Sequence, residues 1–371
     1  MPVALIIAAV VALDPAAWVT EFPVPTAGSA PRGIARGSDD NLWFTQLNSS
    51  SFGRMTVAGA VTEHLLPSEH SGPIGITTGA DGNLWVAEFD GHRIARITPS
   101  GGIHEFGPTH GKPFFIASGA DGNLWFTELD TGEIGRISVA GSLAEFALPT
   151  RDAQPIGIAL GADHNIWFAE FAANQIGRIT LDGVVTEFAL PHEASGPRAV
   201  TSGPDSNLWF SEEFGNRIGR MTLDGEVREF EVPTADSHPR SIVSGPDGSL
   251  WFTEFAGDQI GRMTTSGDVL EFALTPFSRP IDITVGPDGN LWFTEGDGNR
   301  IGRVSAQRTT CVGDCGGTST VVISDLLTLV NIVLGNAEPS ACPGGIPSSA
   351  PVDVVLILQA VGNALNGCPG G

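Results

Sequence analysis

A short apolar run centred on tryptophan recurs along the chain, bounded each time by turns rich in Gly, Asp and Asn. These tryptophans follow one another at steps of 40 to 42 residues, and each has a proline twelve positions before it and an arginine eleven positions after it. Such a constant spacing indicates an internal repeat, here of seven units. The repeated tryptophans are Trp43, Trp85, Trp125, Trp167, Trp209, Trp251 and Trp292.

The pattern inside one unit predicts four short strands. In the second unit, a strand after Pro73 leads into the turn Asp81-Gly82-Asn83, and further strands follow at 84–86 and 94–97, before a last alternating segment. Asp-Gly between apolar runs is typical of a tight hairpin, because both central residues of the favoured turn need positive φ. Four strands in about 42 residues make one propeller blade, so the sequence predicts an all-β, seven-bladed propeller, with a stacked solenoid as the alternative. The tryptophans are expected between blades, with carbohydrate stacking as the alternative.

The last strand of the ring comes from the start of the chain. Six units end in an acid followed by Phe or His, at Glu63, Glu105, Glu145, Glu187, Glu229 and Glu271, but nothing similar follows Arg303. The same pattern stands alone at residues 19–22. We therefore expect this N-terminal segment to supply the outer strand of the seventh blade, which a solenoid would not need.

Composition divides the chain into three parts. Residues 3–13 form an apolar run that is too short to span a bilayer but has the length of the apolar core of a secretory signal, although no basic residue precedes it. We predict a leader segment at 1–14, the propeller at 15–308 and a tail domain at 309–371. The protein is then secreted, periplasmic or at the cell surface, with no transmembrane span. A buried N-terminal strand is the alternative for the first segment.

The tail differs sharply from the propeller. It contains all four cysteines, Cys311, Cys315, Cys342 and Cys368, and no aromatic or basic residue. Two loops, at 314–325 and from Ile346, each lead into an apolar run. This arrangement resembles the paired, EF-hand-like dockerin repeat, which implies a small α-helical attachment module with a protein partner. Because Gly316 and Thr318 occupy ligand positions of the first loop, Ca²⁺ binding is not expected in the tail. Disulfides are expected instead, and the sequence leaves three pairings open.

Charge excludes one class of partner. The chain carries 42 acidic and 19 basic residues, for a formal charge of −23, and its basic residues are scattered. Nucleic-acid binding needs a clustered basic face, so nucleic acid is not an expected partner.

Three positions past each tryptophan lies a residue that we call the ring position, and six of the seven are glutamates. Since these residues end the second strand of each blade, they are expected to form a ring on one face of the propeller. The ring could hold a divalent cation, with Glu254 and Glu295 as metal candidates, or attract a cationic ligand. The alternative is a ladder of ion pairs with the arginine eleven past each tryptophan. The ring positions are Gln46, Glu88, Glu128, Glu170, Glu212, Glu254 and Glu295.

The residue after each repeat proline, which we call the axial position, varies most between units. The seven residues there are Arg32, Ile74, Phe114, Ile156, Arg198, Arg240 and Ile281. Because the first strand of a blade lines the channel, we expect an asymmetric site near the axis for a small-molecule or cell-surface ligand that carries carboxylate or phosphate. The ring glutamates could equally neutralise its arginines. The ligand-binding candidates are Arg32, Arg198, His238, Arg240, Arg279 and Asp282.

Units of the form P-x-G-I-T-x-G-x-D-G-N-L-W-F-T-E, then N-x-I-G-R-I-T, then T-E-F-x-L-P, resemble the virginiamycin B lyase family of seven-bladed propellers over about residues 18–305. The resemblance implies a Mg²⁺-dependent carbon–oxygen lyase that opens the ester ring of type B streptogramins by elimination, with a His base. The family's catalytic positions fall on Arg240, Arg279, Ile281 and Glu295, and only Glu295 keeps the expected residue type.

Arg and Ile side chains cannot serve as a neutral base or a metal ligand. We therefore predict a binding or surface-interaction protein that uses its axial face. The alternative is a metal-dependent carbon–oxygen lyase acting on an ester-containing or related substrate. A third reading is an extracellular scaffold, and whether the chain is an enzyme stays open at this point.

Overall fold

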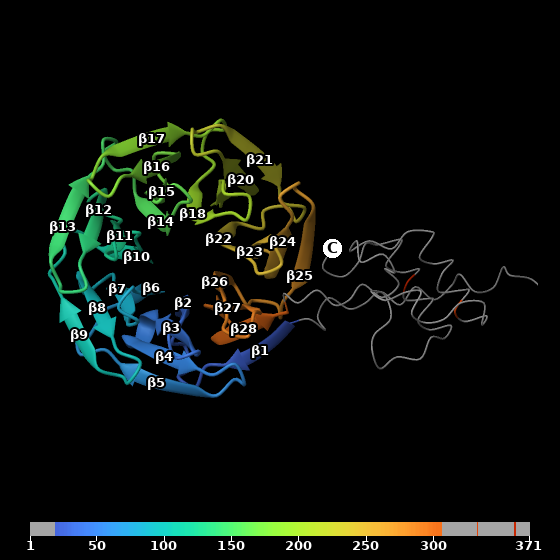
Figure 1. Cartoon of the computed structure of the whole chain (residues 1–371). Coiled ribbons are helices and arrows are strands. Elements are labelled where there is room, and N and C mark those ends of the chain that lie inside the picture. Colours follow the sequence, from blue (N-terminus) through green and yellow to red (C-terminus); the bar gives the residue numbers. More distant parts are fainter. Residues whose placement is uncertain (1–18, 306–331, 333–359, 361–371) are drawn as a thin grey trace, which may run out of the picture. The chain divides into compact units, whose positions relative to one another are not determined.

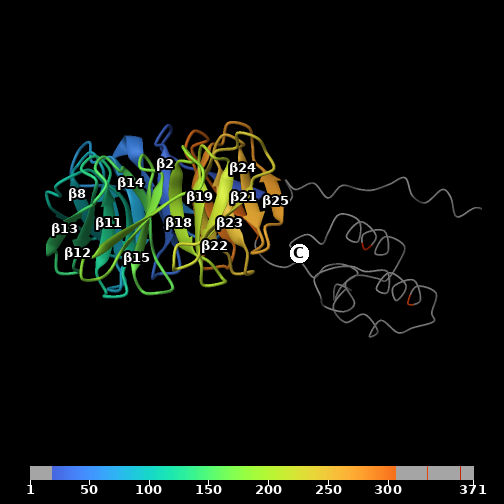
Figure 2. The same cartoon turned by 90° about the horizontal axis from the view of Figure 1, so that it is seen from above.

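Seven four-stranded antiparallel sheets surround a central axis, as Figure 1 shows for this computed structural model. The structure describes residues 19–305 and the single positions 332 and 360. Figure 2 shows the propeller edge on, with its strands running between the two faces. The seven-bladed propeller predicted from the repeat is confirmed, and the solenoid alternative is wrong.

Each blade places its first strand next to the axis and its second strand beside it. A turn of 3-10 helix, Leu47–Ser49, follows β3. The first strands are β2 (Pro31–Arg36), β6 (Pro73–Thr78), β10 (Pro113–Ser118), β14 (Pro155–Leu160), β18 (Pro197–Ser202), β22 (Pro239–Ser244) and β26 (Pro280–Val285). The second strands are β3 (Leu42–Gln46), β7 (Leu84–Glu88), β11 (Leu124–Glu128), β15 (Ile166–Glu170), β19 (Leu208–Glu212), β23 (Leu250–Glu254) and β27 (Leu291–Glu295).

The third and fourth strands build the outer half of each blade. The third strands are β4 (Ser51–Met55), β8 (Arg93–Ile97), β12 (Glu133–Ile137), β16 (Gln175–Ile179), β20 (Arg217–Met221), β24 (Gln259–Met263) and β28 (Arg300–Val304). The fourth strands are β5 (Val61–Leu65), β9 (Ile103–Phe106), β13 (Leu143–Ala147), β17 (Val185–Ala189), β21 (Val227–Glu231), β25 (Val269–Ala273) and, for the seventh blade, β1 (Val19–Pro23).

The N-terminal strand closes the ring. β1 pairs antiparallel with β28, with Thr20 opposite Arg303, and completes the sheet of β26, β27 and β28. The ring of Phe22 stacks on that of Trp292 with centroids 5.5 Å apart. The closure predicted from the missing fourth-strand pattern after Arg303 is therefore confirmed. β1 covers the edge of β28, as the fourth strand covers the third strand in the other six blades.

The core lies between neighbouring blades. Each repeated tryptophan is at most 1% exposed. Trp43 packs with Ile76, Leu84 and Val86 of the next blade. The same arrangement recurs at Trp85, Trp125, Trp167, Trp209 and Trp292. Full burial excludes the carbohydrate-stacking alternative for these rings, and their role in the inter-blade core is confirmed.

A turn aspartate fixes each tryptophan. In the second blade, Trp85 Nε1 donates to Asp81 Oδ1 at 3.1 Å, and Asn83 donates to the same carboxylate through its backbone and side chain. Burial opposes ionisation of Asp81, but these hydrogen bonds outweigh it, so the pKa of Asp81 lies below its usual value. The hairpin predicted from Asp-Gly therefore also satisfies the polar edge of a buried ring.

Several predictions concern residues outside the described part. The leader segment 1–14, the helical dockerin-like tail 309–371 and the disulfides of Cys311, Cys315, Cys342 and Cys368 all lie there, so they stay predictions. Within the described residues, the structure has no helix with the length and apolar character needed to cross a membrane.

Candidate ligand site at the propeller axis

The ring and axial positions lie at the same end of every blade. In the first blade, Pro31 at the start of β2 pairs with Gln46 at the end of β3, and the same pairing recurs in all seven sheets. The axial residues, directly after these prolines, therefore surround the axis at one face. Three carry Arg and four carry Ile or Phe, and Ile281 lies between Arg240 and Arg32 in the order around the axis.

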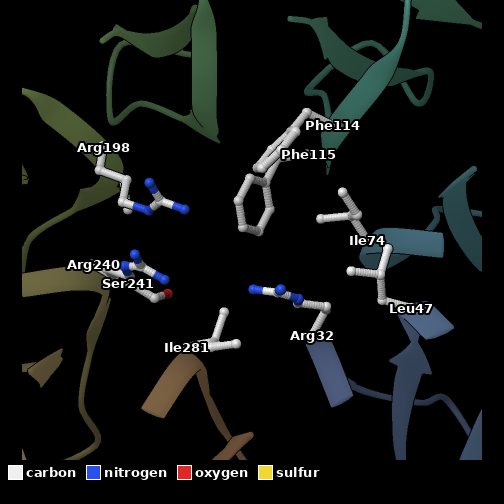
Figure 3. Close-up of a pocket in the computed structure, with 10 residues that line it drawn as sticks. Arg32, Leu47, Ile74, Phe114, Phe115, Arg198, Arg240, Ser241 and Ile281 are labelled. Carbon is white, nitrogen blue, oxygen red and sulfur yellow. The ribbon is translucent and has the colours of Figure 1, made fainter. Parts of the chain in front are cut away.

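These residues enclose a cavity of about 140 Å³ on the axis. Figure 3 shows the guanidinium groups of Arg198 and Arg240 entering it from one side and that of Arg32 from the other. Phe115 projects its ring into the same space. The lining residues are Arg32, Leu47, Ile74, Phe114, Phe115, Arg198, Ala199, Arg240, Ser241 and Ile281.

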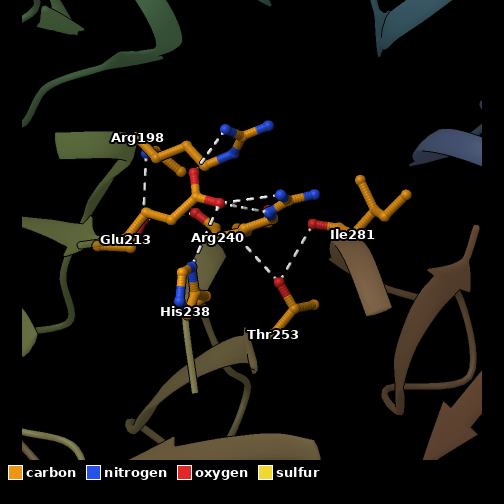
Figure 4. Close-up of polar contacts among 9 residues, drawn as sticks. Arg198, Glu213, His238, Arg240, Thr253 and Ile281 are labelled. Atoms are coloured by element: carbon orange, nitrogen blue, oxygen red, sulfur yellow. Dashed lines mark hydrogen bonds and ion pairs between the residues drawn. The ribbon is translucent and has the colours of Figure 1, made fainter. Parts of the chain in front are cut away.

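Glu213 joins two of the arginines, and sequence analysis did not single it out. Its carboxylate is 5% exposed and accepts from Arg198 Nη1 at 2.7 Å and from Arg240 Nε at 2.9 Å (Figure 4). The residue after the ring position is Leu, Phe or Gly in the other six blades, so Glu213 is the acidic exception. That departure from the repeat was the signal that could have identified it.

The cationic charge of the cavity exceeds its anionic charge. Burial lowers the pKa of Arg240 to about 10, and the like charge of Arg198 adds to this shift. Burial and Arg198 also lower the pKa of Arg32, while Asp297 acts in the opposite direction. Within the described part of the chain, Arg32 has no ion pair, and its buried Nε has no hydrogen-bond acceptor. Three guanidinium groups thus face the cavity, where Glu213 bonds to two of them and Asp297 acts on the third only through its charge.

The remaining ligand-binding candidates lie around the cavity rather than in its wall. His238 Nδ1 is 3.9 Å from Glu213 Oε1, below the Arg198–Arg240 pair. The guanidinium of Arg279 lies 5.2 Å from the centroid of Phe255, a ring that Arg240 covers at 3.3 Å. Both residues therefore sit next to the site without lining it.

Asp282 has a structural role that differs from the predicted one. Its carboxylate accepts from Ser241 Oγ at 2.6 Å and from the backbone N–H of Ile34 at 2.9 Å. It thereby joins three neighbouring blades, and burial raises its pKa. These hydrogen bonds hold the Asp282 carboxylate between the blades. It does not line the cavity.

The ring glutamates face outward along their own blades. Glu170 is fully buried, neither of its carboxylate oxygens has a hydrogen-bond partner, and its carboxyl interacts with that of Glu187 on the fourth strand. Gly177 lies between them, where a Cβ would come within 2.7 Å of Glu170 Oε1. Burial, and then the charge of Glu187, raises the pKa of Glu170 to about 8.

The metal candidates follow the same pattern. Burial and the neighbouring Glu271 raise the pKa of Glu254 to about 8. Glu295 accepts from Arg300 Nε at 2.7 Å, and burial, and then the charge of Glu21, raises its pKa to about 7. In residues 19–305 and at positions 332 and 360, no three His, Cys, Asp or Glu side chains are grouped as metal ligands. These residues do not fit a Mg²⁺ site as they stand, and Mg²⁺ binding stays a prediction.

The alternative prediction, a ladder of ion pairs between the ring glutamates and the arginine eleven past each tryptophan, is wrong, because these arginines lie next to other groups. The arginine eleven past each tryptophan lies opposite that tryptophan on the third strand, as Arg220 does opposite Trp209. Arg220 Nε donates to the turn aspartate Asp205 at 2.6 Å, and Arg54 and Arg262 make the equivalent bond in their blades. The ring carboxylates pair with arginine only where the third strand begins with one, as at Arg217 and Arg300.

Known proteins share both the repeat and the fold. The virginiamycin B lyase family model matches residues 7–110 and 107–313. A solved streptogramin B lyase is 34% identical, with a TM-score of 0.74, over 78% of this chain and 97% of that one. Virginiamycin B lyase from Staphylococcus aureus is 36% identical, with a TM-score of 0.74, over 77% of this chain and 98% of that one. Its catalytically inactive variant, solved with quinupristin, matches equally well.

More distant propellers match in fold alone, such as the WD40 domain of Doa1, which is 13% identical with a TM-score of 0.66. The family match, by contrast, extends over the whole described propeller and is supported by relatives at 34% and 36% identity. The chain therefore belongs to the virginiamycin B lyase family.

Proposed function

We propose that this protein binds a small anionic ligand in its axial cavity through Arg32, Arg198 and Arg240. The observation that carries the proposal is the charge imbalance: three guanidinium groups surround one cavity, Glu213 is the one carboxylate that bonds to any of them among the described residues, and Asp297 acts on Arg32 only through its charge. Bringing like charges together in a partly desolvated space is unfavourable unless an anion joins them. A carboxylate or a phosphate group suits the fork of donors on each guanidinium.

The competing function is a metal-dependent lyase. It is supported by the names of the similar proteins at 34% and 36% identity, which are lyases. The residues at the family's catalytic positions favour binding. Arg240 and Ile281 offer no proton acceptor, and Arg279 lies over an aromatic ring. Glu295 is already bonded to Arg300. Export, and a protein partner for the tail, remain part of the same proposal.

Titration of the protein with sulfate and with acetate at low ionic strength, measured by isothermal calorimetry, tests the anion site. Arg32→Ile is the informative variant, because three other blades carry Ile at the axial position. Charge-assisted hydrogen bonds contribute about 1.5–3 kcal/mol, so the variant should bind either anion at least about tenfold more weakly. Arg36→Gln removes an exposed arginine that pairs with Asp40 and should leave the affinity unchanged.

A second variant moves the affinity in the opposite direction. Glu213→Gln removes the carboxylate that competes for Arg198 and Arg240, so the variant should bind sulfate more tightly than the wild type. Absence of binding by the wild type to both anions would refute the anion site. A Mg²⁺-dependent rise in melting temperature that Glu295→Gln abolishes would instead favour the lyase.

A further inference from the structure

The anion proposal leaves half of the cavity wall without a role. Opposite Arg198 and Arg240 are the side chains of Leu47, Ile74, Phe114 and Phe115, which form the apolar side of the cavity, while Ile281 lies between Arg240 and Arg32 (Figure 3). A bare inorganic anion would touch none of it favourably, and its polar oxygens would lose hydration there. The ligand must therefore bring an apolar part as well as a charge.

Phe115 is the clearest departure from the repeat on this wall. The equivalent residue is Gly33, Gly75 or Gly157 in three other blades, and there an added Cβ would come within 2.3 to 2.7 Å of the next blade's backbone. The third blade instead places a phenyl ring here, and its centroid lies 5.4 Å from that of Phe114 at a tilt of 56°. Phe114 in turn meets Phe89 edge to face at 5.6 Å. Three aromatic rings thus support one side of the cavity.

The volume limits the apolar part to one ring. The cavity measures about 140 Å³. An apolar cavity of about 150 Å³ accommodates a single benzene molecule. A flat ring fits this space better than a branched chain, because aromatic pairs gain from offset or edge-to-face contact and guanidinium groups stack on aromatic faces.

The charge limits the ligand to one carboxylate. Glu213 already bonds to Arg198 and Arg240 and balances one charge of that pair, and Asp297 acts electrostatically on Arg32, so one positive charge remains. Arg32, across the cavity, has a buried Nε without an acceptor, and it is close enough to Arg198 and Arg240 for their like charges to affect it. A single carboxylate between Arg32 and the pair supplies acceptors to both sides.

We infer that the axial ligand is a single-ring aromatic monocarboxylate, with its carboxylate between Arg32 and the Arg198–Arg240 pair and its ring against Phe114 and Phe115. The inference rests on the proposed anion-binding function and narrows it to one chemical class. It requires the ring and the carboxylate on the same small molecule, since each half of the wall recognises only one of them.

Calorimetric titration of the full chain with sodium benzoate, sodium acetate and benzamide separates the two halves of the wall. Benzoate should bind at least about tenfold more tightly than acetate, because burial of the ring adds to the shared carboxylate contact. Benzamide, which keeps the ring without the charge, should show no measurable binding. Saturation transfer from the protein to the benzoate ring protons should report direct contact with the wall.

Phe114→Ile tests the aromatic wall with little risk to folding, since blades 2, 4 and 7 carry Ile74, Ile156 and Ile281 at this position. It should weaken benzoate about fivefold and leave acetate unchanged. Phe115→Leu should do the same, and a thermal scan of both variants confirms that they fold. Arg32→Ile should weaken both carboxylates.

The outcomes distinguish this inference from the function on which it rests. Equal affinity for benzoate and acetate, or a Phe114→Ile variant that binds benzoate like the wild type, would overturn the aromatic carboxylate and leave the anion site standing. Failure of benzoate, acetate and sulfate alike would overturn both. Binding of benzamide as tight as benzoate would show that the ring alone is recognised, which contradicts the role given to the arginines.

Discussion

Replacing a ring glutamate by glutamine should stabilise the propeller, and the gain should depend on pH. Glu170 is the best position, because both of its oxygens are buried without a partner and its pKa is raised from 4.5 to about 8. The first blade already carries the amide, since Gln46 Nε2 donates to Glu63 Oε1 at 2.6 Å. Glu170→Gln copies that arrangement against Glu187.

The size of the stability gain follows from the proton that Glu170 binds in the folded state. Between pH 4.5 and about 8, folded Glu170 is protonated while the unfolded chain is ionised, so its contribution to stability falls as the pH rises through this window. Each unit is about 1.4 kcal/mol, which gives an upper value of about 3 kcal/mol at pH 7. A glutamine needs no proton to donate its hydrogen bond. The variant should therefore gain about 1–3 kcal/mol at pH 7.5 and nothing at pH 4.5.

Thermal unfolding at pH 4.5, 6 and 7.5 measures this difference. For a domain of this size, 1 kcal/mol shifts the melting temperature by about 2 °C or more, so a rise of at least about 2 °C is expected at pH 7.5. Gln46→Glu is the matched control, because it creates a seventh carboxyl pair with Glu63 and should lower the melting temperature over the same pH range. A gain from Glu170→Gln that is equal at all three pH values, or a loss at pH 7.5, would refute the reasoning.

Two further predictions concern the whole ring. The turn aspartates, such as Asp81, have pKa values below 3.8 and stabilise the fold above that pH, whereas the ring glutamates destabilise it above pH 4.5. The melting temperature should therefore peak between about pH 4 and 5, and a maximum at pH 8 would contradict this balance. Phe22→Ala removes the stack on Trp292 at the seam and should lower the melting temperature by several degrees, while Leu65→Ala, at a side chain 74% exposed, should not.

The fold could be predicted in detail because each unit repeats the same local signals. Seven copies of proline, turn and tryptophan fix the blade, and one missing copy of the fourth-strand pattern identifies the strand that closes the ring. The place of residues 19–22 as the outer strand of the seventh blade could be inferred without any contact information, since this segment alone carried the missing pattern, and the structure adds the register of Val19 opposite Val304. Periodicity turns one weak local prediction into a strong global one.

The direction of a repeated side chain could not be predicted in the same way. The ring glutamates were expected around the axis, yet Glu170 reaches outward to Glu187 because Gly177 leaves space between them. This space exists only once the second, third and fourth strands are in register. The order of the strands predicts that a residue lies at the end of its strand, but it does not predict which side chain of the neighbouring strands that residue contacts.

The residues of the candidate site could be predicted at the position that was compared across the blades and that differs between them. Arg32, Arg198 and Arg240 were found at the axial position, and the structure brings them to one cavity. Glu213 and Phe115 break the repeat one position further along and were missed, because those positions were not compared. Each position of the repeat has its own neighbours in the folded propeller, so each has to be compared across the blades separately.

Positions that repeat in every blade and positions that vary between blades have different roles in this protein. The repeated polar residues contact other parts of the same fold. The turn aspartates accept hydrogen bonds from the tryptophans, and the ring glutamates interact with glutamates of the fourth strands. Positions that vary between blades face the axis and create a cationic cavity in a chain of net charge −23. Such a net charge repels a polyanion at long range and repels a monoanion less, while charges inside the cavity are screened little by salt. The surroundings of the site thus favour the ligand that its wall also favours, one negative charge carried on an apolar ring.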